Sequence, residues 1–373
     1  MKREISIHPS ITGIERFISL REKVKTVVKP DLDSYIVGGQ EVLSTSLEDI
    51  LSAFDLKLPQ LIDDPYVLAY TKWLGSSEID WSKALGTKNF VAALAKYKRE
   101  IVELVESIEE TGYADTLIKG RKILELLQGV HVNEKRVRTL IEEGHPMQSF
   151  LPQFGKECAK VKYTHSSKTG RLKVVDGPRV LTVAKQHRDV IVSRYPGGKI
   201  LSVDFTCLEP RVALLAIGKK PEADVYEEMS RKMDQSRAKA KLATLSFLYG
   251  AGASGSIDAK AKEQVKEHFQ VNKLREIILS NNGANAFGRP LHVEDERNLI
   301  SHWVQSTAVD ICLLGFSELA TKLKDHADPL FMIHDDVFFD VPSENLQLVS
   351  DVMSKGVNVS PFGHFPVSLK ECS

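Results

Sequence analysis

The sequence predicts an α+β fold, in which a small antiparallel sheet is combined with several helices. Residues 199–218, KILSVDFTCLEPRVALLAIG, have the pattern of a buried strand followed by a helix that begins near Leu208. Residues 330–341 contain two short aromatic-rich strands joined by a tight turn, which is typical of a β-hairpin. Residues 88–111 carry apolar side chains at three- and four-residue steps, as expected of a long amphipathic helix.

The remaining elements are less strongly patterned. Residues 1–85 alternate short apolar runs with breakers, which predicts a small N-terminal lobe whose role the sequence does not indicate. Two shorter helices are expected near 114–128 and 133–143, and Asn133 is a suitable N-cap for the second.

The composition is that of an ordinary globular protein, with 42% apolar and 27% charged residues. Lys+Arg and Asp+Glu are equal at 50 each, so net charge alone predicts no polyanionic partner. The charge is uneven, however, because residues 156–199 hold eleven Lys and Arg against three acids. This stretch is either a solvated loop or a surface that faces a phosphate backbone.

Four cysteines occur without CxxC spacing, which favours a reducing compartment and buried, unpaired thiols. The first residues, MKREISIHPS, lack the apolar core of a signal peptide. No run of about 18 apolar residues is present, so we expect a cytoplasmic protein with no membrane segment.

Acidic residues lie in two places where a carboxylate is costly. Asp335 and Asp336 stand side by side between two apolar runs, and Asp204 follows a buried strand. An aspartate at a turn or a cap needs no function, but a bound divalent cation would offset the repulsion of two adjacent carboxylates. Oxygen ligands of this kind favour Mg²⁺ or Mn²⁺.

Two helices carry polar stripes. Arg237, Lys241, Leu245 and Tyr249 are four residues apart, and each step on a helix is ~6 Å of rise and ~40° of rotation. The stripe suits a triphosphate and a base, or else it is the basic face of a surface helix. Further along the chain, a second predicted helix face carries three polar residues, Arg297, Ser301 and Gln305.

Together and in this order, these patterns resemble the polymerase core of the family A DNA polymerases, the bacterial polymerase I type. The family's motif A, an Asp with Glu five positions on and Arg two later, matches Asp204, Glu209 and Arg211. The helix with Arg297 and Gln305 matches one that touches primer and template.

The other two motifs of the family follow at the expected spacing. Arg237, Lys241, Tyr249 and Gly250 match motif B, but Leu245 stands where the family has an aromatic residue. Motif C, His-Asp-Glu, is matched by a set of three adjacent residues, His334, Asp335 and Asp336, and the family's Thr-Gly-Arg-Leu by residues 169–172.

The resemblance implies a right-hand polymerase fold with an antiparallel β-sheet palm, helical fingers and a helical thumb. It is close over residues 160–342 and weak over 86–155. The implied domains are a small lobe at 1–85, the thumb at 86–165, the first part of the palm at 166–220, the fingers at 221–295 and the second part of the palm at 296–373.

The implied activity is template-directed addition of dNTPs to a primer 3′ end by two-metal-ion phosphoryl transfer, with release of pyrophosphate. Asp204 and Asp335 would hold two Mg²⁺ ions, for which Mn²⁺ can substitute. Asp336 would support them from outside the metal shell, since strand alternation predicts that its side chain points off the opposite face. Lys241 would assist catalysis as a proton donor to the pyrophosphate.

The resemblance also assigns binding roles. Arg237 and Lys241 would contact the triphosphate, with Leu245 and Tyr249 beside the nascent pair, and Glu209 would exclude ribonucleotides by filling the space under the 2′ position. The implied DNA contacts are Arg171, Gly250, Arg297, Gln305 and His334.

Three residues differ from the family's motifs, and these differences are expected to affect sugar selectivity and substrate binding. Leu245 cannot stack on the sugar as an aromatic ring does, Asp336 is one methylene shorter than Glu, and Ser301 replaces an Asn. Residues 1–155 contain no Asp-x-Glu, so we expect no proofreading exonuclease.

The expected partners are primer–template DNA and dNTPs, in replication or repair in a bacterial or phage-infected cell. We expect a monomer, with processivity proteins as separate chains. A single-subunit RNA polymerase, a reverse transcriptase and a non-catalytic DNA-binding relic are the alternatives, and Glu209 argues against the first because it would clash with a 2′-hydroxyl.

Overall fold

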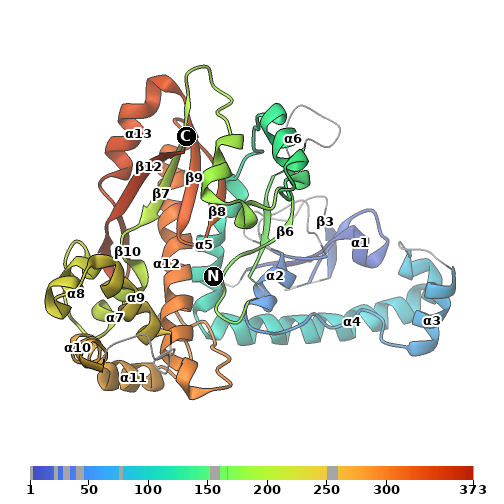
Figure 1. The fold of residues 1–373 in the computed structure, drawn as a ribbon. Coiled ribbons are helices and arrows are strands. Elements are labelled where there is room, and N and C mark those ends of the chain that lie inside the picture. Colours follow the sequence, from blue (N-terminus) through green and yellow to red (C-terminus); the bar gives the residue numbers. More distant parts are fainter. Residues whose placement is uncertain are drawn as a thin grey trace. The chain divides into compact units, whose positions relative to one another are not determined.

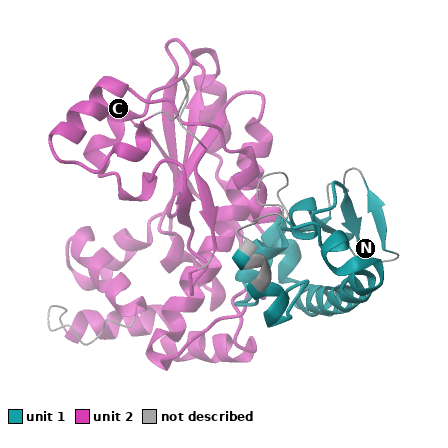
Figure 2. Ribbon diagram, turned by 90° about the vertical axis from the view of Figure 1, so that its right-hand side faces the viewer, with its two compact units in different colours: residues 1–118 teal, residues 119–373 magenta. Residues whose placement is uncertain are grey.

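The fold was obtained as a computed structural model (Figure 1). The chain divides into two compact units, Met1–Ile118 and Lys119–Ser373 (Figure 2), and the division falls inside the range 86–165 that the sequence assigns to a thumb. The structure describes residues 3–20, 24–27, 34–38, 46–74, 79–151, 160–165, 167–249 and 259–372.

The first unit contains a small four-stranded sheet. Its strand order is β3-β2-β1-β4, in which β1 is antiparallel to β2 and parallel to β4. The strands are β1 (Ile5–Ile7), β2 (Phe17–Ser19), β3 (Lys25–Val27) and β4 (Tyr35–Val37). The helices of this unit are α1 (Pro9–Thr12), α2 (Leu47–Ser52), α3 (Pro65–Leu74) and α4 (Trp81–Glu110).

The long amphipathic helix predicted at 88–111 is confirmed as α4. Gly86 has φ 71° and ψ 154°, so the continuous helix begins just after it, and Gly112, with φ 70°, follows the C-cap residue Thr111. The buried stripe consists of Phe90, Leu94, Tyr97, Ile101, Val105 and Ile108.

The second unit is built on a central antiparallel sheet with the strand order β12-β7-β9-β8. The strands are β7 (Lys199–Phe205), β8 (Asp328–Ile333), β9 (Asp336–Val341) and β12 (Val367–Cys372). The predicted strand is therefore β7, and the predicted hairpin is β8–β9. Helix α7 (Leu208–Ala216) follows β7 as expected, and it packs against the long helix α12 (Leu299–Leu323).

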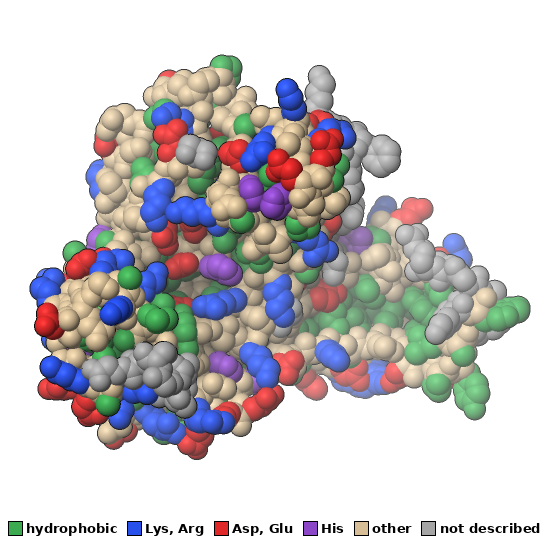
Figure 3. All heavy atoms as spheres, in the orientation of Figure 1, with side chains coloured by type: hydrophobic (Ala, Val, Ile, Leu, Met, Phe, Trp, Pro, Cys, Tyr) green, Lys and Arg blue, Asp and Glu red, His purple; other side chains and the backbone are tan. Residues whose placement is uncertain are grey.

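A helical module lies between the two halves of this sheet in the sequence. It consists of α8 (Val225–Met233), α9 (Arg237–Leu248), α10 (Ala259–Phe269) and α11 (Val271–Ser280). Figure 3 shows that Lys and Arg side chains gather on the visible surface of this module.

Smaller elements complete the second unit. Asn133 caps α6 as predicted, because its side chain accepts a hydrogen bond from the backbone N–H of Arg136 at 3.1 Å. The elements are α5 (Tyr113–Leu126, which begins in the first unit), α6 (Glu134–Glu142), α13 (Leu346–Met353), β5 (Lys162–Thr164), β6 (Lys173–Asp176), β10 (Val357–Val359) and β11 (Gly363–Phe365). Short 3₁₀ turns occupy Gln148–Phe150, Val180–Thr182, Lys185–Val190, Glu296–Asn298 and Ser343–Asn345.

Two expectations from composition concern burial. Cys207 and Cys312 are free and buried and Cys372 is free and partly buried, whereas Cys158 lies outside the described residues. Among the helices formed by the described residues, one has the length and composition to cross a membrane, namely Glu296–Leu323. In this helix, 72% of the apolar window is buried inside the protein. Burial of this kind is typical of the core helix of a globular unit.

Candidate active site

The β8–β9 turn brings Asp335 beside the end of β7. His334 adopts a left-handed conformation, with φ 57°, which allows a tight two-residue turn. The backbone N–H of Phe205 donates to the carbonyl of Asp335 at 3.3 Å, so Asp335 and Asp204 come from adjacent segments. Burial, and then the negative charge of Asp204, raise the pKa of Asp335.

Asp336 lies on the same face of the sheet as Asp204. The two residues are direct partners across β7 and β9, and Ser202 donates its hydroxyl to Asp336 Oδ1 at 2.7 Å. The expectation that Asp336 points off the face opposite to Asp335 stays a prediction, because this pairing relates Asp336 to Asp204 alone. Burial raises the pKa of Asp336 to about 6.

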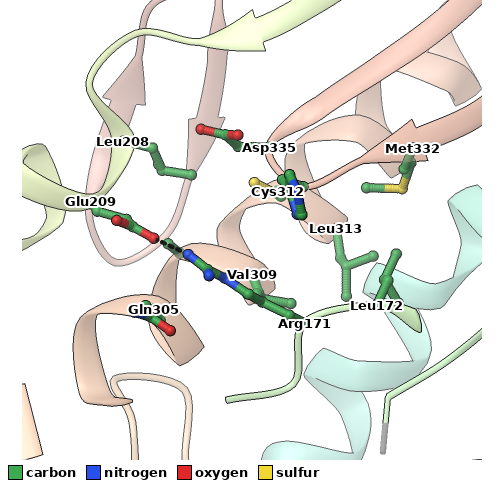
Figure 4. A pocket seen from close by; sticks show the side chains of 12 residues that line it. Arg171, Leu172, Leu208, Glu209, Gln305, Val309, Cys312, Leu313, Met332 and Asp335 are labelled. Carbon is green, nitrogen blue, oxygen red and sulfur yellow. Dashed lines mark hydrogen bonds and ion pairs between the residues drawn. The ribbon is translucent and has the colours of Figure 1, made fainter. Parts of the chain in front are cut away.

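A pocket beside Asp335 contains a partly buried carboxylate, Glu209, and Figure 4 shows its contact with Arg171. Arg171 Nη2 donates to Glu209 Oε1 at 2.7 Å, and the Tyr249 hydroxyl donates to the other oxygen of Glu209. Burial raises the pKa of Glu209, and the charge of Arg171 opposes this effect. The pocket is lined by Arg171, Leu172, Leu208, Glu209, Gln305, Ala308, Val309, Cys312, Leu313, Met332, His334 and Asp335.

The loop that carries Arg171 is positioned by a close backbone approach. Gly170 has φ 76°, and a Cβ atom at this position would lie 2.0 Å from Nη1 of Arg289. Arg289 is buried and donates from Nη2 to the carbonyl of His165 at 3.2 Å. Glycine is therefore required here for both its conformation and its small size.

The cationic end of α9 faces α8 rather than the carboxylates. Arg237 donates from Nε and Nη2 to Asp224 Oδ2, at 2.9 and 2.7 Å. The Arg237 guanidinium carbon and Lys241 Nζ each lie 5.4 Å from the centre of the Tyr226 ring. Asp224 also caps α8 by accepting from the N–H of Tyr226 at 2.9 Å. Neither Asp224 nor Tyr226 was predicted, although an aspartate before a helix is a recognisable cap signal.

The other two residues of the motif B stripe, Leu245 and Tyr249, make different contacts from those of Arg237 and Lys241. Leu245 is half-buried and packs against the hydrophobic core, while the C-cap residue Tyr249 reaches Glu209. Gly250, to which the resemblance assigns a DNA contact, lies outside the described residues.

The polar helix face predicted for Arg297, Ser301 and Gln305 lies only partly on α12. Arg297 belongs to the 3₁₀ turn before the helix, and its exposed side chain pairs with Asp295 at 2.6 Å. Ser301 is buried and donates to the carbonyl of Asn298 at 3.0 Å. Gln305 lines the pocket, so it is the member of this set that the structure brings to Asp335.

A lysine that the sequence did not indicate lies next to Asp204. Lys370 on β12 places Nζ 3.2 Å from Asp204 Oδ2. The two residues are 166 positions apart, and only the pairing of β12 with β7 brings them together. No local pattern in the sequence predicts such a contact.

The donor atoms at this site fit a divalent cation that also binds substrate. Within the described part of the chain, no three His, Cys, Asp or Glu side chains form a ready cluster around one ion. Mg²⁺ is usually held by one or two carboxylates, and phosphates and water supply its other ligands. Asp204 and Asp335 offer such a pair. Burial, and then the negative charge of Asp204, raise the pKa of Asp335, and a nearby cation would oppose both effects.

Comparison with known proteins gives the fold. No family model matches the chain. A solved structure of the POL domain of Pol1 from M. smegmatis, in complex with DNA primer-template and dNTP, matches with a TM-score of 0.59 and 14% sequence identity. The chain has a polymerase-like fold. The match covers 91% of this chain and 86% of that chain, so the similarity extends well beyond the residues 160–342 that the motifs span.

Proposed function

We propose that the protein is a template-directed DNA polymerase that adds dNTPs to a primer 3′ end and releases pyrophosphate. The observation that carries the proposal is the position of Asp204 and Asp335. Asp204 lies near the end of β7 and Asp335 lies in the adjacent β8–β9 turn, beside a pocket lined by Arg171 and Glu209. The polymerase-like fold supports the same function. The proposal includes the absence of intrinsic proofreading.

The proposed palm is the central sheet with α12, and the proposed fingers are α8–α11. Asp204 and Asp335 would hold two Mg²⁺ ions, which supply Lewis acidity toward the primer hydroxyl and the triphosphate. Asp336, fixed by Ser202, supports the carboxylate pair from the same face.

The proposed fingers bind the triphosphate. The charges of Arg237 and Lys241 both lie close to the Tyr226 ring, and pre-placed cations stabilise charge that develops on phosphate oxygens. Arg237 is paired with Asp224, so it would have to exchange a carboxylate for a phosphate when the nucleotide binds. Lys241 forms no ion pair among the residues described, and it is the proposed proton donor to pyrophosphate.

The pocket beside Asp335 determines the choice of sugar in this proposal. Glu209 is held from two sides, by Arg171 and Tyr249, so its carboxylate cannot easily move to admit a 2′-hydroxyl. His334 and Gln305 line the same pocket and would contact the primer terminus and the minor groove. We place the protein in the cytoplasm, as a monomer that acts on primer–template DNA in replication or repair.

Primer extension by the purified chain tests the proposal. The substrates are a gapped duplex and a long single-stranded template, each with a labelled primer, in the presence of Mg²⁺ or Mn²⁺. We expect extension with dNTPs, little extension with rNTPs, and no extension when the divalent ion is chelated.

The other outcomes identify the alternatives. Equal extension with rNTPs would indicate an RNA polymerase-like enzyme. Tight binding to primer–template without extension in either metal would indicate a DNA-binding relic. Primer shortening in the absence of dNTPs would contradict the expected lack of a 3′–5′ exonuclease.

A further inference from the structure

Lys370 is placed on the face of the sheet that carries the carboxylates. In the register of β12 and β7, Ser368 is opposite Asp204 and Lys370 is opposite Ser202. Lys370 therefore lies diagonally across from Asp204 on the same face, within reach of a long side chain. Its ammonium group is 3.2 Å from Asp204 Oδ2.

The charges around Asp204 explain why a cation is favourable here. Asp336 is directly opposite Asp204 on the other neighbouring strand, and like charges in this position repel. The negative charge of Asp204 also raises the pKa of Asp335. Among the described residues, Lys370 is the one basic side chain that pairs with Asp204. Its charge offsets part of the local negative charge when no divalent ion is bound.

We propose that Lys370 is a tethered cation that competes with the divalent ion for Asp204 and so weakens metal binding. The inference rests on the proposed function, because it takes Asp204 to be a metal ligand. A divalent ion on Oδ2 and an ammonium 3.2 Å from the same atom would repel each other, so the lysine must leave when the ion binds. The Lys370 side chain is 52% exposed, which gives it space in solvent to move. Lys370 is thus a positioning residue that acts through Asp204.

The same two strands contain a matched pair for comparison. Lys199 on β7 and Glu371 on β12 are also diagonal neighbours, and their charged atoms are 2.7 Å apart. This pair lies on the other face of the sheet. Replacement of Lys199 removes an exposed ion pair between the same strands without touching the Asp204 site, so it controls for any effect on sheet stability.

Mn²⁺ binding to the whole chain, without DNA or nucleotide, tests the inference by electron paramagnetic resonance of the free ion. We expect Lys370→Met to tighten Mn²⁺ binding by about two- to fivefold, the range that corresponds to one partly exposed ion pair. Lys370→Arg keeps the charge and should bind Mn²⁺ about as the wild type does. Lys199→Met should also match the wild type. Thermal unfolding of each variant verifies that it is folded.

The outcomes separate this inference from the proposed function. Asp204→Asn should remove the Mn²⁺ site in the wild-type background. If it does so while Lys370→Met binds Mn²⁺ no more tightly than the wild type, the role of Lys370 is refuted and the metal site stands. If Asp204→Asn leaves Mn²⁺ binding intact, Asp204 is not a ligand, and both the metal assignment and the inference fail.

Discussion

Asp204 and Asp336 face each other directly across β7 and β9, so two carboxylates share one face of the central sheet. Like charges at directly opposed positions destabilise a sheet. The turn that follows β8 adds Asp335, and the sheet thus concentrates three acids in one region. Under the proposed function, bound divalent ions would offset this repulsion.

Replacement of the two proposed metal ligands should stop the reaction and preserve binding. We expect Asp204→Asn and Asp335→Asn each to lower the rate of primer extension by at least ~10³-fold, because each removes charge that stabilises the transition state. Affinity for primer–template DNA, measured by fluorescence anisotropy without metal, should stay close to the wild-type value. A wild-type rate in either variant would overturn the metal assignment.

Neutralising Asp336 should stabilise the protein above pH 6. The folded-state pKa of Asp336 is about 6, above the ordinary value of 3.8, so the folded protein holds a proton that the unfolded chain has lost between these values. The contribution of Asp336 to stability therefore falls as pH rises through this range and stays low above it. We expect Asp336→Asn to raise the free energy of unfolding by about 1 kcal/mol at pH 7.5 and by much less at pH 4.

The measurement is denaturant unfolding at both pH values in the presence of a chelator. Ser202→Ala provides a second arm, because it removes a hydrogen bond that favours the charged form of Asp336. This variant should lose more stability at pH 7.5 than at pH 4. An equal effect of Asp336→Asn at the two pH values would contradict the argument.

Glu209 should control discrimination against ribonucleotides. Glu209→Ala opens the space that the carboxylate fills, and we expect the ratio of rNTP to dNTP incorporation to rise by tenfold or more, or about 1.4 kcal/mol. Tyr249→Phe removes only the hydrogen bond to Glu209 and should shift the ratio in the same direction by less. Single-nucleotide incorporation kinetics measure both, and unchanged ratios would rule out this role for Glu209.

An aromatic residue at position 245 should alter sugar selectivity. We expect Leu245→Phe to change the incorporation of dideoxynucleotides relative to dNTPs by about tenfold. Leu242→Phe is the matched control, since Leu242 is on the same helix but 61% exposed. The two variants should therefore differ in a competition assay between ddNTPs and dNTPs. Identical behaviour would refute the placement of Leu245 at the nucleotide.

Release of Arg237 from its carboxylate partner should favour nucleotide binding. Asp224→Asn keeps a good N-cap for α8 and removes the negative charge that Arg237 contacts at 2.7 Å. We expect the KM for dNTP to fall by about threefold, as is typical of one partly exposed ion pair. Glu222→Gln, which breaks the exposed pair with Arg231 on the same helix, should leave KM unchanged. A rise in KM for Asp224→Asn would mean that Asp224 orients Arg237 productively.

Local patterns in the sequence predicted the elements that hold the candidate site. Strand β7, the start of α7 and the β8–β9 hairpin all follow from apolar runs and breakers within a few residues. The N-cap role of Asn133 was also predicted from its immediate sequence neighbours.

The sequence analysis was incomplete where contacts between distant elements determine the position of a side chain. The pairing of Asp336 with Asp204 depends on the register between β7 and β9. Arg297 was expected on a helix face, but it lies in the 3₁₀ turn that precedes α12 and pairs there with Asp295. The contacts of Asp204 with Lys370 and of Arg237 with Asp224 require the packing of elements that are not adjacent in the sequence.

The position of β12 also affects how the protein forms during synthesis. Strand β7 is hydrogen-bonded to β9 on one side and to β12 on the other, and Phe205 of β7 pairs with Val367 of β12. A ribosome must therefore translate most of the chain before β7 acquires its second neighbour. Until then the nascent strand that carries Asp204 has an open edge, and such an edge can pair with other chains.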